Sequence, residues 1–314
     1  MDNERDLRVA VRGLTAALAL TALLMAPQCA RACACGCGVF DLGTQSMFPT
    51  REGWMFSLEY DFMNQNRNWA GGAVAPAVNN DDRQIRTTFV TFTGAYEFKR
   101  KWSLSVEAPY WQRLLRTSAD AGATLAYSHA AIGDVRVRGT FTGFSPDLST
   151  GLSAGLKLPT GDFTYSNFDR DTEIGTGSTD LLVDAYHLGP LTPDGSWGWF
   201  AAASWDQPFT YHGAYQPGRE LDATAAAYPA GWGSGALRVA PVFKVIASIR
   251  AADAGAAANP QGSGYRRAFV APGLDARVAG LRVAADVYVP LAQHVNGNQL
   301  LAPVLFKLHI ARAF

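Results

Sequence analysis

Residues 54–63 read WMFSLEYDFM, and their chemical character alternates along the whole stretch. One set of alternate positions carries only large apolar or aromatic side chains, namely Trp54, Phe56, Leu58, Tyr60 and Phe62. The other set carries Met55, Ser57, Glu59, Asp61 and Met63. Because successive side chains of a β-strand point to opposite faces, this stretch predicts a strand with one apolar face and one more polar face.

The same alternation recurs along the chain, for example in 102–110, 131–143 and 281–291. No long stretch keeps the period near 3.6 residues that an amphipathic helix requires. The pattern therefore predicts an all-β fold of about twelve strands. They are expected at 53–63, 86–98, 101–112, 131–144, 148–160, 177–189, 196–209, 217–229, 235–251, 266–279, 281–293 and 300–314.

The connections between these strands alternate in length. Those after the even-numbered strands are short, and most of those after the odd-numbered strands are long and polar. This arrangement is typical of bacterial outer-membrane barrels. Inside lipid, a β-sheet must close on itself so that every backbone polar group is paired. We therefore expect a closed antiparallel transmembrane β-barrel with both the N- and C-termini periplasmic, because an even strand number puts both ends on the short-turn side.

Aromatic placement distinguishes this barrel from a soluble β-sandwich. Trp197, Trp199 and Trp205 share one face of one expected strand. From Trp197 to Trp205 the strand spans roughly 26 Å, or about 20 Å of height when tilted. That height is near the roughly 25 Å apolar band and its flanking aromatic girdles. The apolar faces are therefore expected to contact outer-membrane lipid.

The N-terminus indicates export. Arginines precede a short apolar stretch at 14–25, which is too short to span a bilayer as a helix, and 30–32 matches a small-x-small cleavage site. A retained N-terminal anchor is the alternative. We expect a signal peptide at 1–32, a Cys-rich periplasmic tail at 33–52 and the barrel at 53–314. The balance of 27 basic and 27 acidic residues gives no reason to expect nucleic-acid binding.

The chain ends in LFKLHIARAF, residues 305–314. Phe306, Leu308, Ile310 and Phe314 resemble the C-terminal signal that outer-membrane barrels present to the barrel-assembly machinery. Arg312 departs from this pattern, because an apolar or aromatic residue is usual at that position. The machinery is thus an expected partner.

Charged residues at the polar positions are expected to face the lumen, since a charge near the bilayer centre costs about 2–4 kcal/mol. Two interpretations remain open: a salt-bridge network that plugs the barrel, or the polar wall of a conduit. The lumen-facing candidates are Glu59, Asp61, Glu107, Asp134, Arg136, Arg138, Lys157, Asp184, Arg238, Lys244, Arg277, Asp286, Lys307 and His309.

Two segments resemble a known family. GLKLPTGDF at 155–163 and IGTGSTD at 174–180 are similar to a signature of an outer-membrane transporter-like group labelled "MetA-pathway of phenol degradation". The resemblance implies a barrel involved in passage of small, hydrophobic or aromatic compounds. From the residues alone, Pro159 and Gly161 can end a strand and Gly175 and Gly177 can begin the next. A turn with no ligand and a binding role both remain open.

The segment 169–173, DRDTE, has alternating carboxylates that suit a hard cation such as calcium. It lacks the full calcium-loop spacing and contains Arg170. A solvated acidic loop is therefore the preferred interpretation, and residues 79–82 are interpreted in the same way.

Cys33, Cys35 and Cys37 begin the expected mature chain. Three closely spaced thiols suit a soft metal ion such as Cu(I) or Zn(II). A flexible or partner-linked tail and lipid attachment to Cys33 are the alternatives. Apart from this metal, the sequence predicts no cofactor.

The expected function is an outer-membrane channel for a small-molecule permeant. The alternative is a structural or docking barrel whose Cys-rich tail binds metal or a periplasmic partner. An enzyme is not expected. Twelve-stranded barrels include a phospholipase, but none of the five histidines lies in the His-x-Ser-Asn arrangement of that family.

Overall fold

The computed structural model describes residues 52–99, 101–119, 123–234 and 236–314. Within these ranges the chain forms β-strands and one 3-10 helix, η3 (Ala77–Asn79). No helix there is long and apolar enough to cross a membrane. The strands are β1 (Gly53–Gln65), β2 (Arg67–Gly71), β3 (Ala73–Val74), β4 (Asp82–Phe98), β5 (Trp102–Ser118), β6 (Thr124–Ile132), β7 (Arg136–Phe141), β8 (Thr150–Lys157), β9 (Ser178–Pro190), β10 (Trp197–Tyr211), β11 (Glu220–Pro229), β12 (Leu237–Arg250), β13 (Tyr265–Val278), β14 (Leu281–Leu301) and β15 (Leu305–Ala313).

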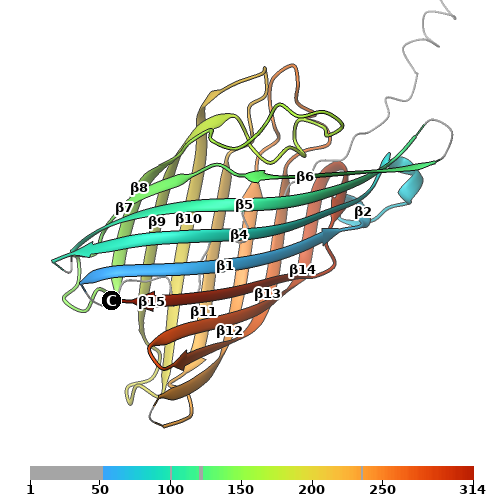
Figure 1. Ribbon diagram of the computed structural model, residues 1–314. Coiled ribbons are helices and arrows are strands. Elements are labelled where there is room, and N and C mark those ends of the chain that lie inside the picture. Colours follow the sequence, from blue (N-terminus) through green and yellow to red (C-terminus); the bar gives the residue numbers. More distant parts are fainter. Residues whose placement is uncertain (1–51, 100, 120–122, 235) are drawn as a thin grey trace, which may run out of the picture. The chain divides into compact units, whose positions relative to one another are not determined.

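Twelve of these strands form one closed antiparallel barrel. Its order is β1-β4-β5-β7-β8-β9-β10-β11-β12-β13-β14-β15, and β15 pairs with β1 to close the circle (Figure 1). The closing register runs from Met55 opposite Ala313 to Met63 opposite Leu305. The predicted all-β closed barrel of about twelve strands is confirmed.

Differences from the predicted strands are concentrated at the long-loop end. β4, β5 and β14 extend past their expected limits there, because their neighbours continue to pair with them beyond the apolar band. The expected strand at 131–144 is split into β6 and β7 by residues 133–135. Residues 300 and 301 belong to β14, so the last strand begins at Leu305 rather than at 300.

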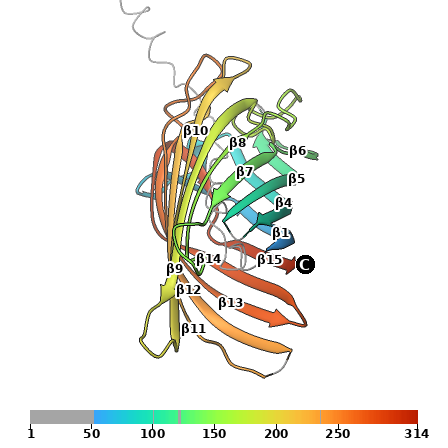
Figure 2. The same ribbon diagram turned by 90° about the vertical axis from the view of Figure 1, so that its left-hand side faces the viewer.

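The split between β6 and β7 leaves β6 at an edge of the sheet. β6 pairs with β5, whereas the only barrel partner of β7 besides β5 is β8. Beyond Lys157 the chain leaves the wall and does not return until Ser178. Among the described strands, β6 therefore has one hydrogen-bonded neighbour, and Figure 2 shows it at the border of the barrel wall.

The apolar strand faces point outward. Phe56, Val106 and Leu308 are 40%, 43% and 39% exposed, although a soluble core would bury them. Trp197 and Tyr211, the first and last residues of β10, are also exposed. An apolar exterior with exposed aromatics toward both ends is the surface of a membrane-embedded barrel. The prediction that the apolar faces contact lipid agrees with this exposure.

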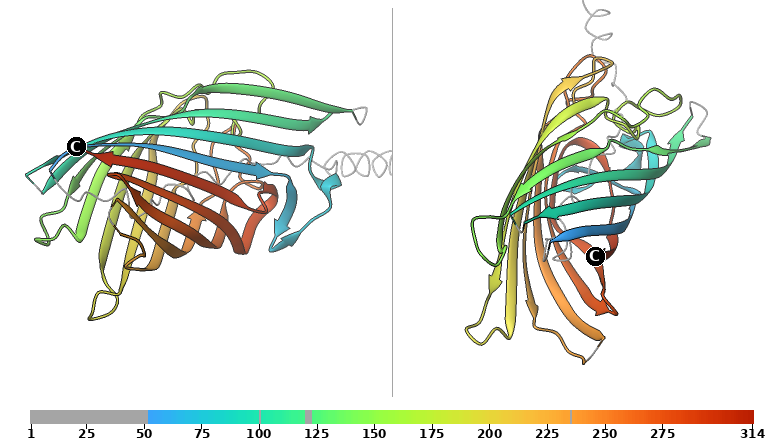
Figure 3. Two further views of the ribbon diagram at one scale, coloured as in Figure 1. Left: turned by 60° about the horizontal axis from the view of Figure 1, so that its bottom comes forward. Right: turned by 60° about the vertical axis from the view of Figure 1, so that its left-hand side comes forward.

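The beginning of β1 and the end of β15 lie side by side at the short-turn end of the barrel (Figure 3). The backbone N–H of Phe314 donates to the carbonyl of Trp54 over 2.8 Å. Phe306, Leu308 and Ile310 lie on the outward-facing side of β15. Phe314 directly follows this strand and stacks against the guanidinium of Arg312, whose Cζ is 5.1 Å from the ring centroid. Their role as an assembly signal stays a prediction.

Candidate functional site

The inner wall of the barrel carries nearly all the predicted charged residues. Twelve of the fourteen candidates are buried or partly buried on the inward side, and Asp134 among them lies in the break between β6 and β7. They are Glu59, Asp61, Glu107, Asp134, Arg136, Arg138, Lys157, Asp184, Lys244, Asp286, Lys307 and His309.

Arg238 and Arg277 differ from the other candidates. They are Cα partners on β12 and β13, and they have the inward parity of those strands. Both are exposed, because they lie at the short-turn rim. They are therefore not part of an enclosed lumen.

Ion pairs within the wall join neighbouring or next-but-one strands. Arg138 on β7 contacts Glu107 on β5 (Nη1–Oε1, 2.6 Å) and Asp184 on β9 (Nε–Oδ2, 2.9 Å). Lys244 on β12 contacts Asp286 on β14 (Nζ–Oδ2, 2.7 Å). Pairs of this reach follow the wall and do not cross the barrel, so they fit the conduit-wall interpretation better than a plugging network.

Part of the interior is apolar. Met63, Phe89, Phe269 and Tyr288 are almost completely buried on inward faces, and they pack with Ile246, Ala271, Ala302 and Leu305, with Trp111 against them. Met63 is placed by the sequence pattern on the more polar face of its strand, and this cluster shows that such inward positions can be apolar. Apolar residues at inward positions fill this part of the lumen as they would fill a soluble core.

The β8–β9 loop (residues 158–177) folds into the lumen. Asp134 receives hydrogen bonds from both ends of this loop: the N–H of Gly161 donates to Oδ1 over 3.0 Å, and the N–H of Thr176 donates to Oδ2 over 2.9 Å. The N–H of Gly175 also donates to the carbonyl of Asp162 over 2.7 Å. One inward carboxylate therefore brings the two family-like segments together.

Glycine is required at this junction. A Cβ added at Gly175 would overlap the backbone carbonyl of Gly161, and a Cβ at Gly161 would lie 2.7 Å from the Cα of Gly175. The predicted strand-ending role of Gly161 is thus accompanied by a packing role.

Two arginines position the loop: Arg113 on the barrel wall and Arg170 within the loop itself. Arg113 on β5 is 1% exposed, and its Nη1 donates to the carbonyls of Thr172 (2.5 Å) and Glu173 (3.2 Å). Arg170 lies in the loop, and its Nη1 donates to Glu173 Oε2 over 3.0 Å. The guanidinium of Arg170 also stacks on the ring of Tyr215, with Cζ 4.7 Å from the centroid. These contacts give the loop a defined position.

The solvated acidic loop expected at 169–173 is wrong for most of its residues. Thr172 is fully buried, and Asp171 and Glu173 are largely shielded from water. Burial, with Asp169 and Asp253 nearby, raises the pKa of Asp171 to about 8. Burial also raises the pKa of Glu173 to about 7, against the lowering effect of Arg170. At neutral pH these carboxyls therefore titrate in place.

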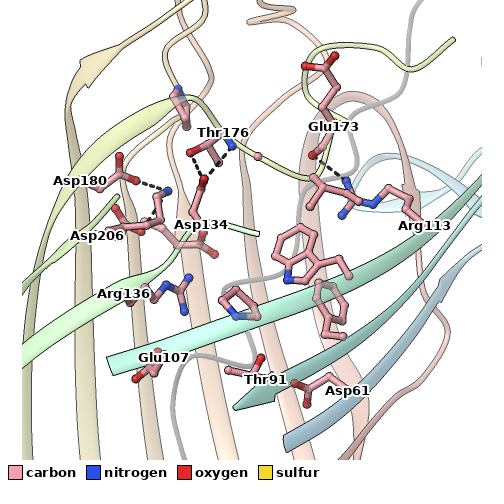
Figure 4. Close-up of a pocket in the computed structure, with 18 of the residues that line it drawn as sticks. Asp61, Thr91, Glu107, Arg113, Asp134, Arg136, Glu173, Thr176, Asp180 and Asp206 are labelled. Atoms are coloured by element: carbon pink, nitrogen blue, oxygen red, sulfur yellow. Dashed lines mark hydrogen bonds and ion pairs between the residues drawn. The ribbon is translucent and has the colours of Figure 1, made fainter. Parts of the chain in front are cut away.

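A cavity of about 170 Å³ lies beneath this loop. Figure 4 shows Asp61, Glu107 and Thr91 on the wall below it and Glu173 and Thr176 above. Phe89, Pro109 and Trp111 supply an apolar flank. This flank continues into the buried apolar cluster around Phe269 and Tyr288, called the dry cluster below. The cavity thus offers a small solute both charged groups and an aromatic surface.

Several residues of the cavity were missed by sequence reasoning. Arg113 lies one residue past the expected end of its strand, and Arg250 and Glu220 lie at strand ends beside the long loops. Asp180 and Asp206, which are labelled in Figure 4, are inward on β9 and β10, and both form ion pairs with Lys157. Asp206 follows Trp205 on the opposite face, so the alternation itself could have found it.

Cys33, Cys35 and Cys37 lie outside the described residues, and their metal or partner role stays a prediction. Within the described ranges, no group of three or more His, Cys, Asp or Glu residues is arranged to hold a metal ion.

Solved structures share this architecture. The chain is similar to the COG4313 outer membrane channel from Pseudomonas putida F1, with 13% identity, a TM-score of 0.65, and coverage of 87% of this chain and 100% of the other. It is also similar to the β domain of the Bordetella autotransporter BrkA, with 8% identity, a TM-score of 0.51, and coverage of 84% and 100%. No protein-family model matches the sequence, and no curated protein matches it. At these identities the likeness establishes the fold, which is that of the outer-membrane β-barrels.

Proposed function

We propose that the chain forms a channel for small molecules in the outer membrane, with its long loops facing outward and its short turns facing the periplasm. The observation that carries this proposal is the cavity beneath the β8–β9 loop, enclosed by a closed barrel with an apolar exterior. The orientation follows the usual arrangement of short periplasmic turns and longer extracellular loops.

The permeant that fits the cavity is a small molecule with an aromatic or apolar body. Phe89, Pro109 and Trp111 form an apolar flank next to the polar wall, and rings stack on such surfaces. The resemblance of 155–163 and 174–180 to the "MetA-pathway of phenol degradation" group supports the same class of permeant. Passage needs no chemistry on the solute, in keeping with a protein that is not an enzyme.

The test is permeability of the full mature protein in planar bilayers and in liposomes loaded with a phenol-sized aromatic solute. We expect discrete conductance steps and solute release. Arg113→Gln should raise the conductance, because the β8–β9 loop loses its buried donor at the Thr172 carbonyl. The matched control is Arg116→Gln, which removes an exposed arginine from the outer face of the same strand and should leave conductance unchanged. A folded protein that conducts neither ions nor solute, even as Arg113→Gln, contradicts the proposal.

A further inference from the structure

A groove of about 570 Å³ lies at the long-loop end of the barrel wall, across β10 to β14, and outward residues line it together with the inward Glu220, Arg250 and Tyr265. Its outward-facing lining is one continuous row of directly opposed residues on five neighbouring strands. In order, the row is Trp205, Leu221, Ile249, Arg266 and His294. Arg219 lies one step further toward the loops, where its carbonyl accepts a hydrogen bond of 2.9 Å from Ala251. The groove therefore runs from apolar to basic along one row of the sheet.

The carboxylate that lines this groove, Glu220, has inward parity, and its contacts are to the inward residues Ser248, Tyr265 and Arg250. Arg219, Arg266 and His294 are exposed, and within the described part of the chain none of them forms an ion pair. The strand carboxylates all have inward parity: Glu59, Asp61, Asp82, Glu97, Glu107, Asp180, Asp184, Asp206, Glu220, Asp222, Asp275 and Asp286. The outer face at this end thus presents positive charge alone.

The position of the groove defines what can occupy it. Trp205, Leu221 and Ile249 are exposed on the lipid-facing side, and β10 continues from Trp205 to the exposed Tyr211, an aromatic residue at the loop end of the strand, as in the girdles of outer-membrane barrels. Exposed arginine side chains such as Arg219 and Arg266 can bind phosphate through two parallel hydrogen bonds. A ligand that satisfies both ends has an acyl chain at the apolar end and a phosphate at the basic end.

We propose that this groove binds a phosphorylated glycolipid of the outer leaflet, of the kind that lipid A represents. Arg219 and Arg266 bind its phosphate, and an acyl chain lies along Leu221 and Ile249. The proposal rests on the outward orientation of the long loops given under the proposed function, because only then does the groove face the outer leaflet.

The test is binding of diphosphoryl lipid A to the full mature protein in detergent micelles, measured by native mass spectrometry and by thermal unfolding. We expect saturable binding and a raised melting temperature. Lipid A stripped of its phosphates should bind much more weakly. The double variant Arg219→Gln/Arg266→Gln should lose affinity by roughly a hundredfold, about tenfold for each charge-assisted phosphate contact.

The matched control is Arg238→Gln/Arg277→Gln, which removes two exposed, opposed arginines from β12 and β13 at the other rim. Its affinity should equal that of the parent protein. Equal affinity in the Arg219/Arg266 variant, or equal binding of phosphate-free lipid A, overturns the proposal. Conductance of the same samples separates the two proposals: lipid binding without conductance refutes only the channel, and conductance without lipid binding refutes only the groove.

Discussion

Two regions of the barrel interior are built on opposite principles. In the cluster that contains Phe269 and Tyr288 the inward side chains are apolar and buried, so the wall is braced by a packed core, although the Lys244–Asp286 ion pair borders it. Beneath the β8–β9 loop the inward side chains are charged, and Arg113 and Asp134 position a loop instead of filling the space. The same inward strand positions therefore either close the lumen or keep it accessible. The comparison indicates that stability resides mainly in the dry region and permeability in the loop-covered region.

The largest expected effect is a loss of stability when the dry cluster is disrupted. Phe269→Ala removes a fully buried ring and should lower the free energy of unfolding by about 3–5 kcal/mol. Urea unfolding in lipid vesicles, followed by tryptophan fluorescence, measures it. Phe243→Ala on the neighbouring strand is the control, because Phe243 is 56% exposed to the lipid side and lipid can fill the space left. A loss no larger than that of the control would show that the cluster does not brace the barrel.

A smaller effect should separate the two regions. Gly175→Ala forces a methyl group against the Gly161 carbonyl and should displace the β8–β9 loop at a cost of about 1–3 kcal/mol. Single-channel conductance should rise while the barrel remains folded. Gly139→Ala is the control, because its nearest neighbour, the Ala154 carbonyl oxygen, would be 3.9 Å away. Unchanged conductance in Gly175→Ala would argue against the loop as the constriction.

The smallest expected effect is on pH. The pKa of Asp171, raised to about 8, and that of Glu173, raised to about 7, exceed their ordinary values, so the inserted loop holds protons more tightly than a solvated one. Its insertion is therefore favoured at low pH and weakened as pH rises from about 4 to about 8. Conductance should increase between pH 5 and pH 8.5.

Asp171→Asn removes the more strongly shifted carboxyl and should flatten that pH profile. Asp194→Asn, at an exposed turn where hydrogen bonds from the Thr192 side chain and from Ser196 lower the pKa to about 2, is the control and should leave the profile intact. A conductance that falls with rising pH would reverse the assigned sign.

The barrel was predictable because every strand must present apolar side chains to lipid, and that requirement is local and repeated. The alternating residues 54–60 alone already show this requirement. The course of the β8–β9 loop could not be predicted in this way, because it depends on Asp134 and Arg113, which are distant from the loop in sequence. The dry cluster was missed for another reason: Met63 and Phe89 occupy inward positions where the pattern alone permits either polar or apolar residues.

The seam between β1 and β15 ties the two ends of the barrel sequence together. Lys307 Nζ reaches Glu59 Oε2 over 2.8 Å at a buried position, so residues almost 250 apart must meet before either charge is neutralised. Pairing of such sequence separation is slow to form and comes late in folding. A chain cut short by its last few residues would keep most of its hairpins but would leave backbone N–H and C=O groups unpaired in hydrocarbon at the seam. Insertion therefore requires that synthesis of these residues is complete.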